Sequence, residues 1–469
     1  MNAAIVIVGA GPAGMRAAEQ VVAAGQRPVV IDEGLRCGGQ IYRQPPAAFQ
    51  RTHRALYGFE ADKARALHER FAELLPQLDY RPNSLVWNIE HPALHLLQEG
   101  RADTLRYQAL ILATGATDRV LPFPGWTLPG VTTLGGAQVA LKYQACLLGP
   151  RIVFAGTGPL LYLVAWQYAS HGAQVVAVLD TAPPGAQQAA LPQLLARPGV
   201  AARGAYFLAR LRLAGVAVHH GVRLLRAQGV DRVTALHWRR ADGHEQRSTC
   251  DAIATGHGLR SETQLADLAG CRFAYQPVDQ AWLPERGPAG RSTVPGVYLA
   301  GDGAAILGAD AAELSGAVAA LAALEDLGLA APASQAKAAA LEGGLQRHTR
   351  FRAGLETAFA LPLQWAAEAS DELIVCRCEE ITAGELRHCV KVTGTREMNR
   401  LKALTRIGMG RCQGRMCAPA TARLLAHAAG CELQAVGRLR GQAPVKPVPI
   451  AALATTEPIR TVPPEQRDD

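Results

Sequence analysis

The stretch from residue 4 to residue 32 constrains what this chain can fold into more than any other part of it. An apolar, β-prone run over 4–8 precedes glycines at GxGxxG spacing, an Ala-rich run over 15–24 and a second apolar run over 29–31. Short apolar runs of this kind indicate buried strands, and the longer run between them indicates a helix packed on those strands. The strand–turn–helix–strand order predicts an α/β fold built on a parallel, nucleotide-binding sheet.

Each glycine of this motif has a physical role in binding a dinucleotide. Gly9 allows a tight turn, Gly11 lets the backbone approach the pyrophosphate, and Gly14 lets the helix pack closely on the strand. The helix N-terminus then presents free N–H groups and the positive end of the helix dipole to the pyrophosphate. Asp32 ends the second strand, where its carboxylate can accept hydrogen bonds from both ribose hydroxyls. The motif therefore predicts a bound dinucleotide.

Two turns of small residues follow further along the chain. A Gly-Gly-Gln turn ending at Gln40 comes directly after the ribose acid, and we expect its backbone and the Gln40 amide to face a flavin ring. A buried run over 110–113 ends in Thr114 and Gly115, a turn small enough to let the chain pass close to a bound dinucleotide. The position of the first turn favours a flavin over an ordinary glycine loop.

A Gly-Asp turn closes another predicted strand at residues 297–299. The carboxylate of Asp302, directly after Gly301, can accept a hydrogen bond from the ribityl chain of FAD, while the helix that follows meets the pyrophosphate with its N-terminus. The alternative is that Asp302 only caps that helix. Because this turn occurs together with the N-terminal glycine motif, we favour the flavin role.

A second copy of the glycine motif lies in the middle of the chain. A strand over 152–155 leads into Gly156 and Gly158, and the next strand ends at Asp180. Leu161 replaces the third glycine, whose role is close helix packing, so this site is loosened or reshaped. If a nucleotide binds here, the acid favours NAD over NADP. A nucleotide fold without a nucleotide is the equally weighted alternative.

Composition limits the partners and the compartment. The 469 residues carry a formal net charge of +8, and their basic residues are scattered among few aromatics, which argues against nucleic-acid binding. No apolar run is long enough to cross a membrane, and the first residues lack the features of a signal peptide. Ten cysteines without a secretory signal favour a reducing compartment. We therefore expect a cytoplasmic protein and leave peripheral attachment to an anionic membrane surface open.

The motifs GAGPAG, GGQ, two ATG turns and VYLAGDG together resemble the flavoprotein disulfide reductase superfamily with two dinucleotide-binding domains, of the thioredoxin-reductase-like size. The resemblance implies FAD in a split domain over 1–120 and 257–330, with a nicotinamide-type domain over 121–256 inserted between. One departure matters, because no two cysteines between residues 1 and 370 have the spacing of the redox-active CxxC. Disulfide reduction is therefore not expected.

Four cysteines near the end of the chain form a candidate metal site. Cys376 and Cys378 make a CxC pair, and Cys412 and Cys417 make a CxxxxC pair. A Thr-x-x-Glu capping box at Thr382 predicts a helix that begins just after the first pair. Four thiolates brought together by short helices suit a [2Fe–2S] cluster or a structural zinc ion. Zinc is the weaker alternative, because zinc sites favour CxxC spacing.

This cysteine arrangement resembles the bacterioferritin-associated-ferredoxin-like [2Fe–2S] module. The resemblance implies a small helical cluster-binding domain over 371–435, joined to the flavoprotein by a helical connector over 331–370. Five further cysteines have no partners in the sequence, and we expect them to be core thiols: Cys146, Cys250, Cys271, Cys389 and Cys431.

The end of the chain, over 436–469, is rich in proline. These prolines are Pro444, Pro447, Pro449, Pro458, Pro463 and Pro464. A disordered tail and an extended strap over another domain or subunit are both compatible with this composition.

Three phrases, GGQIYRQPP, LATGATDRVLPFPGW and GMGRCQGRMC, resemble a narrower family across nearly the whole chain. This family comprises the FAD and [2Fe–2S] subunits of bacterial multi-subunit amino- or imino-acid dehydrogenases: hydrogen cyanide synthase, octopine and nopaline oxidases, and D-hydroxyproline dehydrogenase. The resemblance implies a substrate-oxidising flavoprotein partner, a small extra [2Fe–2S] subunit, an FMN at the interface and an acceptor in the respiratory chain. Within this family, the overall resemblance favours hydrogen cyanide synthase, and opine and hydroxyproline oxidation are the next activities that we consider.

The residues offer no clear machinery for dehydrogenating an amine. No general base and no carboxylate-clamping arginine stand out, so no catalytic residue is assigned and the chain is expected to carry electrons. A stand-alone NADH-dependent reductase is the main alternative, with NADH near Gly156, Gly158 and Asp180, although Leu161 argues against it. A scaffold for a catalytic partner is a third hypothesis.

Overall fold

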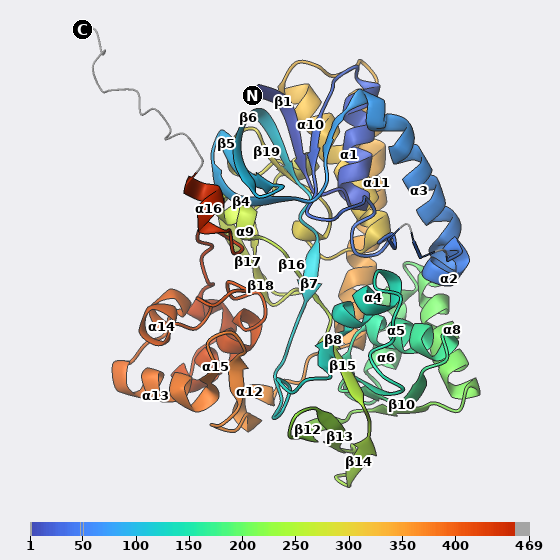
Figure 1. Cartoon of the computed structure of the whole chain (residues 1–469), viewed down its shortest axis with the longest axis vertical. Helices are drawn as coiled ribbons and strands as arrows, with labels where there is room; N and C mark the ends of the chain where they lie inside the picture. The colour runs from blue at the N-terminus through green and yellow to red at the C-terminus, as the bar shows by residue number, and fades with distance from the viewer. Residues whose placement is uncertain (1, 47, 50, 455–469) are drawn as a thin grey trace.

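The computed structural model describes residues 2–46, 48–49 and 51–454. Figure 1 shows three bodies: an upper α/β domain, a lower α/β domain on the right and a small helical domain on the left. The α/β architecture expected from the two glycine motifs is confirmed. Within the described residues, no helix is long and apolar enough to span a membrane.

The upper domain is built on a parallel sheet whose strands end at one edge. From one side to the other, its parallel strands are β3 (Asp79–Arg81), β2 (Val29–Ile31), β1 (Asn2–Val8), β6 (Arg101–Leu112) and β19 (Val297–Leu299). Val8 pairs with both Ile31 and Leu112, and Leu112 also pairs with Leu299. The turns that follow these four strands therefore meet at the same carboxyl edge.

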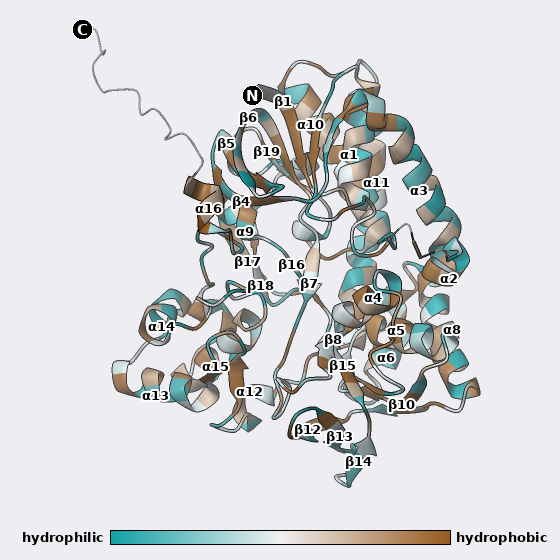
Figure 2. Ribbon diagram, in the orientation of Figure 1, coloured by the Kyte–Doolittle hydropathy of each residue, from teal (hydrophilic) through white to brown (hydrophobic). Residues whose placement is uncertain are grey.

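Helices cover one face of this sheet. α1 (Pro12–Ala23) packs closely against α10 (Ala309–Asp326), because a Cβ on Gly316 of α10 would lie only 2.0 Å from the carbonyl oxygen of Ala13. α3 (Ala61–Leu74) lies beside α1. Apolar side chains of these elements form one core, in agreement with the brown colouring of the central strands in Figure 2: Ile5, Ile7, Ala17, Val21, Leu67 and Phe71. The hairpin β4 (Ser84–Glu90) and β5 (Ala93–Gln98) pairs with the first half of β6.

The lower domain has a sheet of the same kind. Its parallel strands lie in the order β11 (Ala217–His220), β10 (Gln174–Asp180), β9 (Arg151–Thr157), β15 (Ala252–His257) and β8 (Val131–Thr133). The longer helices of this domain are α4 (Leu134–Lys142), α5 (Pro159–Ser170) and α8 (Pro198–Leu213). A small antiparallel sheet of β12 (Arg223–Gly229), β13 (Val233–Arg239) and β14 (Glu245–Thr249) completes it.

The chain crosses between the two α/β domains twice. It leaves the upper domain along β7 (Ala116–Asp118) and returns along β16 (Leu259–Ser261), and these two strands pair antiparallel. A long helix, α11 (Ser334–Ala358), then packs along α10 and contacts the short helices α6 (Ala186–Ala189) and α7 (Leu191–Leu194) of the lower domain. The two domains are therefore connected by the paired strands β7 and β16 and by α11, which contacts both domains.

Short elements build the helical domain: α12 (Trp365–Glu368), β20 (Ile374–Cys376), β21 (Ile381–Thr382), α13 (Ala383–Thr393), α14 (Met398–Thr405) and α15 (Ala418–Ala429). The predicted capping box is confirmed. The Thr382 hydroxyl accepts a hydrogen bond from the Glu385 N–H at 3.2 Å, and the Glu385 carboxylate accepts one from the Thr382 N–H at 2.7 Å. This cap begins α13 just after the CxC pair.

The helical domain shares a core with the segment that follows the first crossing. The Trp126 indole donates to the Ile374 carbonyl oxygen at 2.7 Å, and the Trp365 indole donates to the Pro122 carbonyl oxygen at 2.7 Å. Buried side chains of this segment, of the lower domain and of the helical domain form one apolar cluster.

The Pro-rich segment runs back over the upper domain. Val445, which is 2% exposed, joins the core of that domain, and its N–H donates to the Trp87 carbonyl oxygen at 3.1 Å. The short helix α16 (Ile450–Ala454) follows. The described part of this segment, residues 437–454 and called the strap below, therefore lies against the upper domain, whereas Pro458, Pro463 and Pro464 lie outside the described residues.

Candidate dinucleotide and cysteine sites

The glycines of the first motif shape the turn between β1 and α1. Gly9 has a φ of +104°, and a Cβ there would lie 2.3 Å from the carbonyl oxygen of Ala113. A Cβ on Gly14 would lie 1.7 Å from the carbonyl oxygen of Gly9, so no larger residue allows α1 to pack this closely on β1. The turn therefore has the tight bend and the close packing that a dinucleotide cradle requires.

Gly11 lies where the backbone is open to a ligand. A Cβ on Gly11 would meet only the Cα of Gly39, at 3.6 Å. The 12-residue helix α1 begins at the next residue, and no side chain caps its first N–H groups. Such free N–H groups bind anions well, and the helix dipole adds to the attraction. This cradle, defined as Gly9, Gly11, Gly14 and the start of α1, fits the pyrophosphate of a dinucleotide.

Asp32 lies beside the cradle at the end of β2. Its Oδ2 accepts a hydrogen bond from the Ala10 N–H at 2.5 Å, and its Oδ1 accepts one from the Gly34 N–H at 2.6 Å. Burial raises the pKa of Asp32, and these two backbone donors act in the opposite direction. Each carboxylate oxygen can accept a second hydrogen bond, so the side chain fits the predicted ribose contact. The sequence did not reveal that Asp32 also braces the glycine turn.

The Gly-Gly-Gln turn lies against the cradle with its backbone. A Cβ on Gly39 would lie 2.9 Å from the Cα of Gly11. The Gln40 side chain is exposed, and its Oε1 accepts a hydrogen bond from the Arg43 guanidinium at 2.8 Å. The contact of Gln40 with a flavin ring therefore stays a prediction.

Thr114 and Gly115 follow β6 at the same edge of the sheet. The Thr114 hydroxyl donates to the Glu262 carbonyl oxygen at 2.5 Å, and the Glu262 N–H donates to the Gly115 carbonyl oxygen at 2.9 Å. A Cβ on Gly303 would lie 2.5 Å from the Thr114 hydroxyl oxygen. The turn is thus held between the Gly-Asp turn and the segment that follows the second crossing.

Gly301 and Asp302 complete the cradle from β19. Gly301 has a φ of +65°, and a Cβ there would lie 2.9 Å from the Cβ of Ala13 in α1. The Asp302 Oδ1 accepts hydrogen bonds from the N–H groups of Leu307 and Gly308, both at 2.9 Å, just before α10. Asp302 thus braces the loop that leads into α10, a role similar to the helix cap considered above as the alternative to FAD binding. A carboxylate has a second oxygen with its own lone pairs, so Oδ2 could accept a ribityl hydroxyl as well.

At the second glycine motif, side chains of the same domain already bond to the groups that a nucleotide would use. Gly156 and Gly158 keep positive φ angles of 120° and 117°. Asp180, however, is fully buried and its Oδ2 accepts a hydrogen bond from the Tyr162 hydroxyl at 2.5 Å. The Gln187 amide donates to the same hydroxyl at 3.3 Å. The sequence shows the change at the third glycine, but the role of the tyrosine next to it was missed. The Tyr162 hydroxyl is bonded to the Asp180 carboxylate, which is the group that a bound ribose would need.

The four predicted ligand cysteines come together in two pairs, each with one member from each sequence motif. Cys376 contacts Cys417, and Cys378 contacts Cys412. The other three thiols all lie within electrostatic reach of Cys417, which is 1% exposed. The folding of the helical domain therefore brings together residues that are far apart in the sequence.

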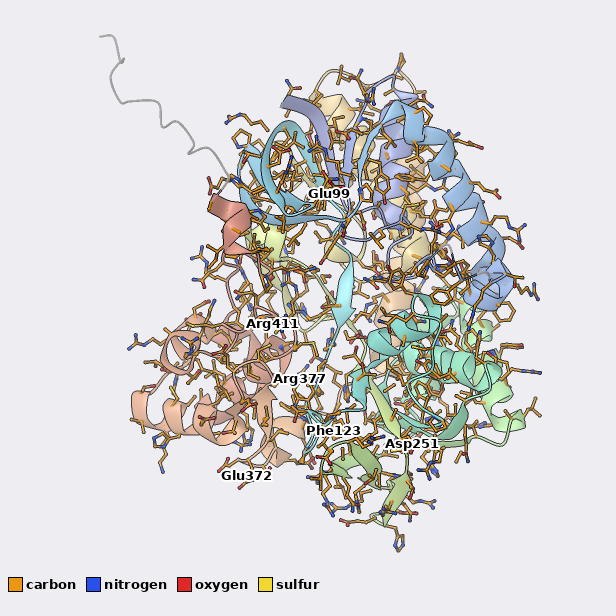
Figure 3. All side chains as sticks on the ribbon, viewed as in Figure 1. Glu99, Phe123, Asp251, Glu372, Arg377 and Arg411 are labelled. Atoms are coloured by element: carbon orange, nitrogen blue, oxygen red, sulfur yellow. The ribbon has the colours of Figure 1, made fainter. Side chains whose placement is uncertain are left out.

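The surroundings of the cysteine pairs favour a thiolate at Cys376, whereas burial raises the pKa of Cys378 and the hydrogen bond with Cys376 raises the pKa of Cys417. The hydrogen bond from Cys417 lowers the pKa of Cys376 to about 6, with further donation from the N–H groups of Glu379 and Gly408. Gly410 allows the close approach, because a Cβ there would lie 2.2 Å from the Cβ of Cys378. Two arginines beside the cysteines, Arg377 and Arg411, lie on the side of the helical domain towards the crossing strands in Figure 3.

The donor set fits a binuclear cluster chemically. Among the described residues, no group of three or more His, Cys, Asp or Glu side chains converges as a metal site. A [2Fe–2S] cluster takes two terminal thiolates on each iron, and two thiol pairs supply that set. The cluster itself stays a prediction. Of the other cysteines, Cys250 and Cys271 are buried, whereas Cys146 is exposed, so the prediction of a core thiol is wrong there. Cys146 lies in the connection after α4, and such connections run over the surface.

Charged residues also meet where the three bodies touch. His257, at the carboxyl end of β15, is 4% exposed, and its Nδ1 has no hydrogen-bond partner within the described residues. Burial, together with the nearby Arg119 and Arg423, lowers its pKa to about 4. Arg352 forms an ion pair with Asp279 at 3.2 Å. No sequence motif signals this junction, because its members come from separate segments.

Known proteins share this architecture. Residues 3–324 match the family model described as pyridine nucleotide-disulphide oxidoreductase, and residues 372–457 match the sarcosine oxidase A3 domain. The structure resembles that of L-proline dehydrogenase from P. horikoshii, with a TM-score of 0.70 and 17% identity over 97% of this chain and 79% of that chain. An identity this low shows a common fold. The fold and the cradle define a flavoprotein of the pyridine nucleotide-disulphide oxidoreductase class.

Sequence relatives narrow this class. The chain is 38% identical to an opine oxidase subunit of Rhizobium meliloti, over 96% of this chain and 87% of the relative. It is 34% identical to the hydrogen cyanide synthase subunit HcnB of Pseudomonas protegens, over 96% of this chain and 97% of the relative. The chain belongs to the family of these two proteins and is an oxidoreductase subunit.

Proposed function

We propose that this chain is the FAD- and [2Fe–2S]-containing electron-transfer subunit of a multi-subunit dehydrogenase that oxidises amino or imino acids at a CH–NH2 or CH–NH bond. Its proposed partners are an FAD protein that oxidises the substrate and a small [2Fe–2S] subunit, with an FMN at the interface through which this chain receives electrons. The observation that carries the proposal is the pairing of four cysteines in a chain that also has a dinucleotide cradle and whose relatives are named as oxidase and synthase subunits.

The carboxyl edge of the upper sheet supports FAD as the dinucleotide. The groups that would hold it are Gly9, Gly11 and Gly14 at the pyrophosphate, Asp32 at the ribose, Thr114, Gly115 and Gly301 along its length, Asp302 at the ribityl chain and Gln40 at the ring. FAD supplies the capacity to take up an electron pair and pass it on. The protein binds and orients it.

The two thiol pairs support an iron–sulfur cluster over zinc. The ligands would be Cys376, Cys378, Cys412 and Cys417, and the cluster would supply one-electron transfer. Backbone N–H groups directed at the Cys376 and Cys378 sulfurs would stabilise thiolates.

The lower domain is proposed to bind no nicotinamide nucleotide. Its ribose acid, Asp180, is buried and already bonded to Tyr162. A stand-alone NADH-dependent reductase needs this acid free, so the geometry disfavours that alternative. Electrons would instead enter from the partner and leave towards a respiratory-chain acceptor, from a cytoplasmic complex at the inner face of the membrane.

Glycine oxidation to cyanide, as in hydrogen cyanide synthase, is the first activity to test. The relatives named opine oxidase and hydrogen cyanide synthase are 38% and 34% identical to this chain, so opines and hydroxyproline belong in the same assay. The substrate would bind to the partner, because no residue of this chain is assigned to the C–N bond.

The cluster is tested by Cys412→Ser. We expect the wild-type protein to contain iron and acid-labile sulfide and to give an electron paramagnetic resonance (EPR) signal when reduced. C412S should lose the iron, the sulfide and the EPR signal. Cys431→Ser is the matched control, because Cys431 lies in the same domain outside the two pairs. Unchanged iron in C412S would overturn the assignment of the ligands.

The role as a subunit is tested by comparing the isolated chain with the complex purified from its source cells. Glycine, hydroxyproline or an opine should bleach the flavin absorbance anaerobically in the complex and leave the isolated chain unchanged. Oxidation of any of these compounds by the isolated chain would contradict an electron-transfer role.

A further inference from the structure

A continuous set of contacts joins the FAD turn, defined as Thr114 and Gly115, to the loop between Cys412 and Cys417. Glu262 lies at its centre. The backbone of Glu262 bonds to the FAD turn through both its carbonyl oxygen, at 2.5 Å, and its N–H, at 2.9 Å. Its carboxylate bonds to the Arg415 guanidinium, with Oε2 2.6 Å from Nε. One residue therefore links the FAD turn to the loop between two of the predicted cluster ligands.

The loop between the two cysteines, residues 413–416, is held by the same short segment of chain. The Arg260 guanidinium donates to the Arg415 carbonyl oxygen at 3.0 Å, and the Gln264 amide donates to the Gln413 carbonyl oxygen at 2.6 Å. Arg415 in turn donates to the carbonyl oxygens of Cys412, at 3.4 Å, and of Val445 in the strap, at 2.6 Å. Side chains on both sides of the contact thus fix the backbone of the loop.

The ion pair at the centre of this contact is largely removed from water. The side chains of Arg415 and Glu262 are 13% and 14% exposed. Charges in such a place are screened less than surface charges, so they act more strongly on their neighbours. The reduction potential of an iron–sulfur cluster depends on nearby net charge, on hydrogen bonds and on exposure. A charged pair that holds a cysteine loop is well placed to set that potential.

We propose that Glu262 and Arg415 are positioning residues that hold the 412–417 loop against the FAD turn and tune the reduction potential of the cluster relative to FAD. The proposal rests on the proposed function, because it requires the cluster. Glu262 contributes a negative charge, which makes the cluster harder to reduce. Arg415 contributes a positive charge, which makes it easier to reduce.

Two single variants of the full chain test the proposal by EPR-monitored redox titration. Glu262→Gln leaves the positive charge of Arg415 uncompensated, so the potential of the cluster should shift to a more positive value. Arg415→Gln removes the positive charge, so the potential should shift to a more negative value. A role in packing alone would not produce shifts of opposite sign at the same contact. The double variant should fall between the two single variants.

Two further variants keep the test decisive. Arg415→Lys retains the positive charge, so the potential of its cluster should be close to that of the wild type. Comparing R415K with R415Q tests the effect of the charge even if E262Q loses its cluster. Arg411→Gln removes an exposed charge next to Cys412, and water screening should make its shift smaller than that of R415Q. Wild-type protein without iron would overturn the proposed function and this inference together. An intact cluster whose potential is the same in R415Q as in R415K would overturn the inference alone.

Discussion

At the scale of single residues, one tyrosine distinguishes the two glycine motifs. Asp32 and Asp180 both end the second strand of a nucleotide-binding unit. Asp32 accepts hydrogen bonds from the backbone N–H groups of Ala10 and Gly34 and can accept more, whereas Asp180 is fully buried against the Tyr162 hydroxyl. A ligand would have to displace that hydroxyl and leave it without its partner, which costs about 1–3 kcal/mol.

His257 makes the stability of the fold depend on pH. Burial lowers its pKa from 6.5 to about 4, so between these values the unfolded chain binds a proton that the folded chain does not. The contribution to stability is fully present above pH 6.5 and is lost as the pH falls towards 4, by about 1.4 kcal/mol per pH unit. His257→Gln should remove this part of the slope, measured by urea unfolding across that range.

His244 provides the control for this prediction. It is an exposed histidine in the turn between β13 and β14, so His244→Gln should leave the pH dependence of unfolding unchanged. Wild-type protein and H257Q with the same slope would show that the His257 imidazole takes up its proton in the folded state.

At the scale of secondary-structure elements, α1 is placed by glycines on both of its sides. Gly14 brings it onto β1, and Gly316 brings α10 onto it. Both contacts are backbone to backbone, so neither can relax by turning a side chain. The position of the first N–H groups of α1, and therefore the shape of the cradle, depends on these two contacts.

Gly14→Ala should abolish FAD binding and destabilise the fold by about 1–3 kcal/mol, because the added Cβ overlaps the Gly9 carbonyl oxygen. The ratio of flavin to protein absorbance and the melting temperature measure the two effects. Gly199→Ala in α8 is the matched control, because its Cβ meets nothing within 4 Å and it should be neutral or slightly stabilising. Full flavin content in G14A would contradict this role of the packing.

The same elements show what the sequence can and cannot predict. The strands, the glycine turns and the Thr382 capping box are signalled within a few residues, so local patterns predict them. The closure of the second site depends on where α5 places Tyr162 relative to β10. The contact between Glu262 and Arg415 joins residues 153 positions apart. Contacts of that kind arise from the packing of whole elements, and no local pattern announces them.

At the scale of the whole molecule, the helical domain is built into the flavoprotein. It shares a core with the lower domain and the segment after the first crossing, and it is tied by the indoles of Trp126 and Trp365. The strap over residues 437–454 returns from it to the core of the upper domain at Val445. The cysteine pairs and the cradle are therefore joined by packed protein, which would suit electron transfer between the proposed FAD and the proposed cluster.

This architecture leads to a prediction about electron entry. The Tyr162 hydroxyl is bonded to Asp180, so we expect the lower domain not to bind NADH. Mixing the isolated protein anaerobically with NADH should therefore leave its flavin absorbance unchanged. Dithionite is the positive control and should bleach the same sample. The complex with its partner should be bleached by the amino acid that the partner oxidises, again with no response to NADH. Rapid bleaching of the isolated chain by NADH would contradict the closed site and would make the lower domain a working nicotinamide domain, with electrons passing from NADH to the flavin and then to the proposed cluster.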